Sequence, residues 1–342
     1  MTMIGYNGST MKFSKDEILF LISIFLFGIS VMLIVFKFIS IPHQVSQVSA
    51  PKHWQIESID TMKYSRDQAR QGLSSATYAQ EVNSQVAAIA ATGANYIAID
   101  TPYDDEFLPI LKLWVHAARV NGLHVWFRGN WAGWEQWFNY PQIDTVTHLA
   151  KTKQFILDNK NLFQNGDIFT ACPECENGYK LNPGDVAQVS SFRQFLLSEH
   201  SMEKDAFASI NKDVSVNYIS MNADVARAVM DKQTTQELGG VVVIDHYVQT
   251  PQQLASDVAE IAQQSGGKIV LGEFGAPIPD LQGTMTDAQQ KDWIETSLQL
   301  LSVDKNLIGV NYWVNEGGST GLWRTDGSAK PAVSVITNYF QD

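Results

Sequence analysis

The sequence predicts an α/β fold, a (β/α)8 TIM barrel preceded by one N-terminal transmembrane helix. Three observations predict it. Eight short apolar runs recur along the chain, amphipathic stretches at helical spacing lie between them, and a 19-residue segment near the start carries no charge. Strands buried on both faces consist of nearly continuous apolar residues, and repeated alternation of strand and helix is typical of a closed parallel barrel.

The predicted strands are rich in Val, Ile and aromatic residues, as buried strands are. They are Gln55–Thr61, Tyr96–Thr101, His124–Arg128, Asp167–Cys172, Ser215–Ser220, Gly240–Asp245, Lys268–Glu273 and Ile308–Trp313. An open, doubly wound sheet is the alternative fold. The barrel is favoured because no Gly-x-Gly-x-x-Gly motif or P-loop follows any of these strands.

Helix signals stand between the strands. Thr77–Ala91 carries apolar residues on one face. Thr250 precedes Pro251, which predicts a capping hydroxyl followed by proline at the first helical position. Thr286 is expected to cap a later helix, and Gly266-Gly267 to end the helix before the seventh strand.

Four segments are predicted: a short tail at 1–17, a transmembrane signal anchor at 18–41, a linker at 42–52 and the barrel at 53–342. The anchor rests on Ile18–Phe36, which as a helix matches the thickness of a bilayer's hydrocarbon core. Val48-Ser49-Ala50 has small residues that suit signal peptidase, but it lies too far beyond the apolar run for an ordinary signal peptide. We therefore expect an uncleaved anchor.

The orientation of this anchor rests on Lys12 and Lys15 before the apolar run against Lys37 after it. Positive residues favour the cytoplasmic side of a membrane. We therefore expect a single-pass protein of the cell membrane, with the barrel outside the cytoplasm.

The charge balance limits the partners. The chain has 24 Lys and Arg against 36 Asp and Glu, a net charge of −12. Contacts to nucleic-acid phosphates need clustered basic residues, so we expect no nucleic-acid partner. Neutral sugars are compatible with this charge.

The only cysteines are Cys172 and Cys175. A structural zinc needs four ligands, and no pair of histidines lies at ligand spacing near these two. The sequence therefore predicts no metal site and no cofactor. It leaves open whether the two cysteines form a local disulfide or pack as thiols.

Polar and aromatic residues cluster at the carboxyl ends of the predicted strands, where barrel enzymes carry their chemistry. They are Asp60, Lys63, Tyr64, Asp100, Tyr103, Arg128, Asn130, Trp131, Glu174, Glu176, Asp245, His246, Tyr247, Glu273, Trp313, Asn315 and Glu316. Asp60, Asp100 and Asp245 are expected to be structural ion-pair partners.

Two carboxylates stand out by position. Glu273 ends the seventh strand, and Glu174 and Glu176 follow the fourth, which lies across a barrel from the seventh. Retaining glycoside hydrolysis needs two carboxylates about 5–5.5 Å apart, one as nucleophile and one as acid and base. Glu273 is the predicted nucleophile. Glu174 is favoured as the acid/base because it directly follows the strand, and Glu176 is the alternative. Arg128 and Tyr247 would donate hydrogen bonds to the ionised nucleophile.

These residues resemble the clan A glycoside hydrolases, cellulase-like and mannanase-like members in particular. Gly272-Glu273-Phe274-Gly275 is similar to the nucleophile motif of strand 7, and Asp245-His246-Tyr247 is similar to the strand 6 site that supports it. Trp313 matches the aromatic platform under the sugar. The segment 321–332 resembles the stretch that follows this Trp in many members. The resemblance implies a retaining hydrolase acting on a β-linked oligo- or polysaccharide.

Six side chains are predicted to bind the sugar: Arg128, Asn130, Trp131, His246, Tyr247 and Trp313. Trp131, Trp134 and Trp137 could stack on sugar faces or equally form one face of a short helix packed into the barrel. The family usually has Asn before the acid/base, whereas Pro173 precedes Glu174 and Cys175 precedes Glu176. A barrel that binds glycans without cleaving them is therefore the alternative function. Other barrel chemistries are disfavoured because Lys63 alone stands near a strand end for a Schiff base and His246 alone for a metallohydrolase.

Overall fold

The structure of the protein is a computed structural model that describes residues 54–341. Within this range, no helix is long and apolar enough to cross a membrane. The predicted tail, anchor and linker lie outside the described residues, so the transmembrane helix stays a prediction.

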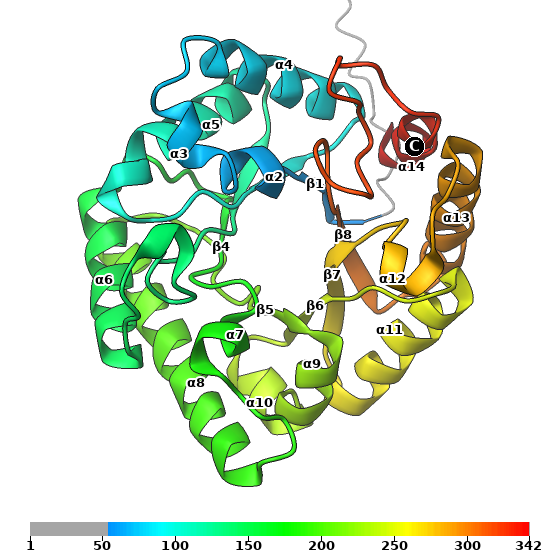
Figure 1. Cartoon of the computed structure of the whole chain (residues 1–342). Helices are drawn as coiled ribbons and strands as arrows, with labels where there is room; N and C mark the ends of the chain where they lie inside the picture. The colour runs from blue at the N-terminus through cyan, green and yellow to red at the C-terminus, as the bar shows by residue number, and fades with distance from the viewer. Residues whose placement is uncertain (1–53, 342) are drawn as a thin grey trace, which may run out of the picture. The chain divides into compact units, whose positions relative to one another are not determined.

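Eight parallel strands form one curled sheet, and the helices surround it (Figure 1). The strands are β1 (Ile56–Asp60), β2 (Tyr96–Ile99), β3 (His124–Phe127), β4 (Ile168–Phe169), β5 (Ser220–Asn222), β6 (Val241–Asp245), β7 (Lys268–Phe274) and β8 (Leu307–Tyr312). Their order is β4-β3-β2-β1-β8-β7-β6-β5, and an isolated parallel bridge between Ile168 and Ser215 joins β4 to the segment before β5. The predicted barrel is confirmed at the level of eight parallel strands alternating with helices.

Six strands lie within two residues of their predicted limits. The two exceptions, β4 and β5, are shorter, and β5 begins at the residue where the predicted strand ends. Backbone hydrogen bonds still join the two segments, because Phe169 N donates to Ser215 O and Ser215 N donates to Asp167 O, each at 2.9 Å. The side chain of Thr170 then donates to Tyr218 O at 2.7 Å, which takes the place of further ladder bonds.

Helices cover the outer face of the sheet. The α-helices are α2 (Met62–Ser65), α3 (Ala69–Gly72), α4 (Tyr78–Ala91), α5 (Leu108–Val120), α6 (Thr145–Asp158), α7 (Cys175–Tyr179), α8 (Val186–Ser209), α9 (Ala223–Val229), α10 (Lys232–Glu237), α11 (Pro251–Ser265), α12 (Pro279–Gln282), α13 (Asp287–Leu301) and α14 (Ala332–Gln341), and the 3-10 helices are η1 (Asp105–Phe107) and η2 (Trp137–Asn139).

Local signals explain the limits of α11 and α13. The hydroxyl of Thr250 accepts a hydrogen bond from Gln253 N, and Gly266 ends α11 with a left-handed φ of 67°, where glycine avoids a Cβ clash. Thr286 and Gln289 form a reciprocal capping box at the start of α13. These three predicted helix boundaries are confirmed.

The core has two parts. A large cluster fills the space between the strands and the helices. A smaller cluster lies inside the barrel and consists of Ile56, Ala98, Trp126, Ile168, Val241, Val243 and Val270. Alternate residues of a strand point to opposite faces, so Val243 belongs to the inner cluster while Val242 and Ile244 belong to the outer one. The charged ends of β1 and β6, Asp60 and Asp245, follow the inner cluster at the carboxyl end of the barrel.

Candidate active site

Glu273 lies near the end of β7, beside β6 and β8. Its side chain is 8% exposed. Gly272 before it leaves room for its neighbours: a Cβ there would meet Arg128 Nη1 at 2.9 Å and collide with the carboxylate of Asp245. Glycine at this position is therefore a packing requirement of the site.

Two donors hold the Glu273 carboxylate. Arg128 Nη2 donates to Oε1 at 2.8 Å, and the Tyr247 hydroxyl donates to Oε2 at 2.7 Å. Burial raises the pKa of Tyr247 well above its ordinary value, so this hydroxyl keeps its proton and stays a donor. Hydrogen bonds to both oxygens favour the ionised carboxylate, which is the form a nucleophile needs.

Arg128 is buried and ion-paired with four carboxylates. Its Nη2 lies 3.2 Å from Asp245 and 2.8 Å from Glu273, and its Nε lies 3.7 Å from both Asp60 and Asp100. The predicted ion-pairing role of the three aspartates is confirmed. Because one guanidinium does not neutralise four buried carboxylates, the cluster favours the binding of a proton.

The pKa shifts within this cluster have clear causes. Burial, and then the charge of Asp245, raise the pKa of Glu273 well above its usual value, while Arg128 lowers it. Burial and the charge of Asp60 raise the pKa of Asp100 well above its usual value. Neither oxygen of Asp100 accepts a hydrogen bond from the described residues, whereas Glu273 accepts two. Asp100 is therefore the carboxyl group best suited to hold the proton.

Glu174 and Glu176 face different surroundings. Glu174 has a left-handed backbone (φ 48°, ψ 47°) just before α7, and its N–H donates to Ser220 O at 3.0 Å. Its charge raises the pKa of Glu273. Glu176 instead accepts hydrogen bonds from Asn222 N at 2.7 Å and Asn222 Nδ2 at 3.1 Å. Glu174 thus interacts with the charges of Asp245 and Arg128, whereas Glu176 is hydrogen-bonded by Asn222 at the end of β5.

The environment of Glu174 suits a proton donor. Burial, then the charge of Asp245, raise its pKa to about 7, against a hydrogen bond from Asn177. Asn177 Nδ2 donates to Glu174 Oε2 at 3.0 Å. Burial also raises the pKa of Glu176 to about 7. The two carboxyl groups therefore differ in their neighbours but not in their pKa.

The remaining predicted residues divide into partly exposed and buried ones. Trp313 is half-buried, makes an edge contact with Tyr247 at 5.8 Å between ring centroids, and has Lys63 Nζ 5.5 Å from its ring centre. His246 Nε2 lies 2.7 Å from Asp257 Oδ2. Asn130 is fully buried, and its Oδ1 accepts a hydrogen bond from Trp131 N. Their sugar-binding roles stay predictions.

The three tryptophans after β3 do not share one environment. Trp131 and Trp134 are buried, and their indole N–H groups donate to Thr152 Oγ1 and Cys175 O. Trp137 is half-buried, with the guanidinium of Arg66 over its ring at 4.5 Å. Two interpretations of this cluster were open, sugar stacking and packing into the barrel. Packing applies to Trp131 and Trp134, and of the three only Trp137 keeps a partly accessible ring.

Glu135 and Arg66 were not among the predicted site residues. Burial raises the pKa of Glu135 to about 7, and its charge raises that of Glu174. Burial lowers the pKa of Arg66, but the charges of Asp67, Asp100 and Glu273 outweigh it and raise the pKa. Both follow strands that the sequence does identify, so their position in the strand 1 and strand 3 loops was an available signal.

No model of a known protein family matches the chain, and no curated protein matches it. Among solved structures, the chain is similar to a GH5_18 protein from Bifidobacterium longum subsp. infantis, with a TM-score of 0.61, 14% identity, and coverage of 84% of this chain and 78% of that one. It is also similar to the β-glucuronidase of Ruminococcus gnavus, with a TM-score of 0.54, 12% identity, and coverage of 77% and 46%. For the β-D-glucuronidase of Dictyoglomus thermophilum, the TM-score is 0.52, the identity 15%, and the coverage 76% and 47%.

The chain spans a little under half the length of these two glucuronidases. At such identities the likeness establishes the fold, and the named activities are those of the other proteins. The barrel that this chain shares with glycoside hydrolases fits the resemblance to clan A that its strand 6, 7 and 8 motifs carry.

Proposed function

We propose that the protein is a retaining glycoside hydrolase that cleaves a β-linked glycan by double displacement. One observation carries the proposal: Glu273 accepts hydrogen bonds from Arg128 and Tyr247 while a second carboxyl, Glu174, interacts with its charge. A carboxylate that accepts hydrogen bonds on both oxygens, beside a second carboxyl that can supply a proton, matches the division of roles that this chemistry needs. Glycoside hydrolases among the structural neighbours support the same class of reaction.

The reaction would proceed in two displacements. Glu273 attacks the anomeric carbon, and Glu174 gives its proton to the glycosidic oxygen as the bond to the leaving sugar breaks. Water then attacks the anomeric carbon of the glycosyl-enzyme, and the Glu174 carboxylate takes a proton from it. The ester bond to Glu273 breaks and restores the nucleophile. Arg128 and Tyr247, which donate to Oε1 and Oε2 respectively, orient the Glu273 carboxylate for attack.

A panel of 2-deoxy-2-fluoro glycosyl fluorides tests this proposal. The fluorine slows both displacements, so a retaining enzyme accumulates the glycosyl ester. We expect one sugar per chain, located on Glu273 by peptide mass spectrometry. Release of reducing sugar from polysaccharides and aryl glycosides should accompany it. Glycan binding with neither labelling nor turnover on any member of the panel would favour the alternative, a barrel that binds glycans without cleaving them.

The pH dependence of kcat/KM should identify the acid. A general acid works in its protonated form, and the pKa of Glu174 is raised to about 7. Activity should therefore fall as the pH rises through about 7. We expect E174Q to remove this alkaline limb and to lower kcat/KM about 10²- to 10⁴-fold for substrates with poor leaving groups. Substrates whose leaving group needs no proton should lose much less.

E176Q is the comparison variant for this profile. Glu176 also has a pKa of about 7, but it is engaged by Asn222. The alkaline limb should persist in E176Q. Loss of the limb in E176Q and not in E174Q would transfer the acid role to Glu176.

We further infer that the barrel is anchored to the cell membrane by the apolar run Ile18–Phe36 and lies outside the cytoplasm. The uncharged length of this run and the lysines before it support the inference. A reporter enzyme active only outside the cytoplasm, fused to the C-terminus, should be active, and the full-length chain should sediment with membranes. Activity of a reporter restricted to the cytoplasm would reverse the orientation.

A further inference from the structure

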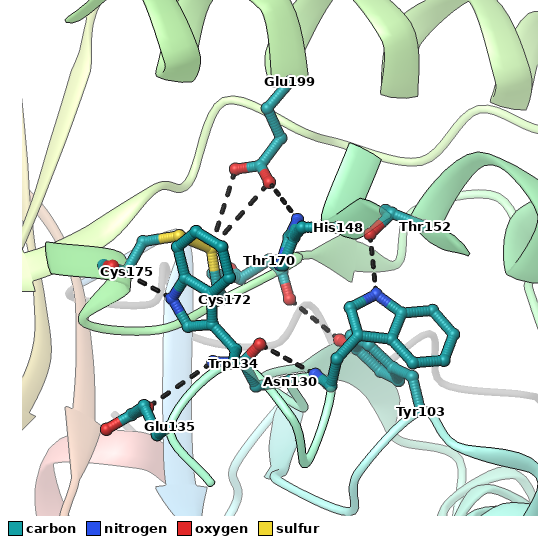
Figure 2. The surroundings of a disulfide bond; sticks show 11 residues. Tyr103, Asn130, Trp134, Glu135, His148, Thr152, Thr170, Cys172, Cys175 and Glu199 are labelled. Atoms are coloured by element: carbon teal, nitrogen blue, oxygen red, sulfur yellow. Dashed lines mark hydrogen bonds and ion pairs between the residues drawn. A yellow bond between two sulfur atoms is a disulfide. The ribbon is translucent and has the colours of Figure 1, made fainter. Parts of the chain in front are cut away.

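We propose that Cys172, Cys175, His148 and Glu199 bind a zinc ion when the two cysteines are reduced. The fold brings these residues together from three places: the segment from the loop after β4 to the first residue of α7, helix α6 and helix α8. In Figure 2 the carboxylate of Glu199 reaches down from its helix toward both the sulfur of Cys172 and the ring of His148. This group is separate from the Arg128 cluster.

The ligand atoms are already close. One atom from each of the four residues lies within 4.8 Å of all the others. Cys172 Sγ is 3.8 Å from both Glu199 oxygens, and His148 Nδ1 is 3.2 Å from Glu199 Oε1. With Zn–S near 2.3 Å and Zn–N near 2.0 Å, the ligand atoms of a tetrahedral zinc lie about 3–4 Å apart. A contraction of about 1 Å at most would bring the His148 and Glu199 atoms into range, and the two sulfurs, bonded in the disulfide, would separate by about 2 Å once reduced.

His148 has a ring nitrogen that lacks the hydrogen bond a buried imidazole normally makes. It is fully buried; its Nδ1 lies 3.2 Å from Glu199 Oε1, and its Nε2 has no hydrogen-bond partner among the described residues. Trp134 packs against its ring with centroids 4.6 Å apart. Most buried polar side chains are paired, and an exception calls for a reason. A metal bond to one nitrogen would supply the missing partner.

A cation would also stabilise the buried negative charge of this region. Glu199 and Glu203 stand one turn apart on α8, and each is 2% exposed. Among residues 54–341, no Lys or Arg forms an ion pair with either carboxylate, and His148, 3.2 Å from Glu199, is the one basic side chain that does. A divalent ion at Glu199 would compensate this buried negative charge.

The types of ligand atom indicate which metal ion the site would bind. Two thiolates, an imidazole and a carboxylate form the mixed sulfur, nitrogen and oxygen set that zinc accepts in four-coordinate sites. Magnesium and calcium prefer oxygen ligands alone. In the structure Cys172 and Cys175 form a disulfide. A thiol reductant would supply two electrons and two protons to open it, and zinc binding would release the two thiol protons to solvent.

The test uses the full-length chain, reduced with a dithiol without oxygen, freed of reductant and then titrated with zinc. We expect one zinc per chain by elemental analysis, together with release of about two protons. Cobalt(II) in place of zinc should give a thiolate-to-metal charge-transfer band and the intense d–d bands of tetrahedral coordination. The oxidised chain should bind neither ion at this site.

Paired variants locate the ligands. H148Q and E199Q should weaken zinc binding by more than the about 10- to 100-fold that loss of a second-shell partner costs. H200Q and E237Q are the matched controls, because His200 on α8 and the exposed Glu237 on α10 contribute no ligand atom to the group. Both controls should keep one zinc per chain.

Two results would overturn the site. One is a reduced wild-type chain that binds no zinc. The other is a cobalt spectrum of the reduced wild-type chain without a thiolate charge-transfer band. Neither result depends on the folding of a variant. Zinc binding unchanged in H148Q and E199Q would remove these two residues from it. None of these readouts uses hydrolysis, so the metal site and the proposed glycosidase activity can fail independently.

Discussion

Glu273→Gln should lower turnover by about 10⁴- to 10⁶-fold while the chain stays folded. The amide cannot form the glycosyl ester, and loss of a nucleophile in other covalent mechanisms has effects of this size. The variant should be at least as stable as the wild type at pH 7. The raised pKa of Glu273 means that its ionised form is destabilised in the folded protein, and glutamine removes that charge. Initial rates on the best substrate and thermal unfolding measure the two effects.

E237Q is the control for this experiment, because Glu237 is exposed on α10, away from the carboxyl end of the barrel. It should retain full activity. A small external nucleophile such as azide should partly restore turnover in a glycine or alanine variant of Glu273, where space replaces the carboxylate, and should give product of inverted configuration. Full activity of E273Q on any substrate that the wild type cleaves would rule out Glu273 as the nucleophile.

Arg128→Met should destabilise the fold by about 3–5 kcal/mol at pH 7, the usual cost of removing one partner from a buried ion pair. The change leaves Asp60, Asp100, Asp245 and Glu273 without their shared cation. The loss of stability should be smaller at lower pH. Without Arg128 the carboxyl pKa values rise further, and protonation of the folded state then relieves the uncompensated charge. Urea unfolding of both chains at pH 7 and pH 5 measures this difference.

R324M provides the matched control, since Arg324 pairs with Asp287 where both side chains are more than 40% exposed. R324M should lose much less stability than R128M, because solvent screens such an exposed pair. A loss for R128M that is equal at both pH values would contradict the electrostatic account and would point to packing of the arginine side chain instead.

Much of the fold could be predicted from local pattern alone. Continuous apolar runs specify strands buried on both faces, so β1, β2, β3, β6, β7 and β8 lie close to their predicted limits. Short-range signals fixed helix boundaries as well, as Thr250 and Gly266 illustrate for α11. The limits of β4 and β5 were harder to predict from the sequence, because only a few backbone hydrogen bonds join these segments. The side chain of Thr170 completes the pairing. Such a contact leaves no periodic pattern.

Part of the candidate site was also predictable. A glutamate that ends an apolar strand after a glycine is unusual, and this singled out Glu273 without the structure. The choice between Glu174 and Glu176 depends on the left-handed backbone of Glu174 and on Asn222, which is engaged with Glu176 from another strand. Sequence spacing cannot supply that information, because the two glutamates are only two residues apart.

The sequence by itself determined the kind of barrel and the residue at the end of its seventh strand, because both depend on which side chains are apolar along one segment. Tertiary structure decided what surrounds the charges. It placed four carboxylates around Arg128, and it brought His148 and Glu199 to Cys172 and Cys175, where spacing alone predicts two ligands. The physical reason is that burial and electrostatic partners arise from packing between distant segments, and no local pattern of residues encodes them.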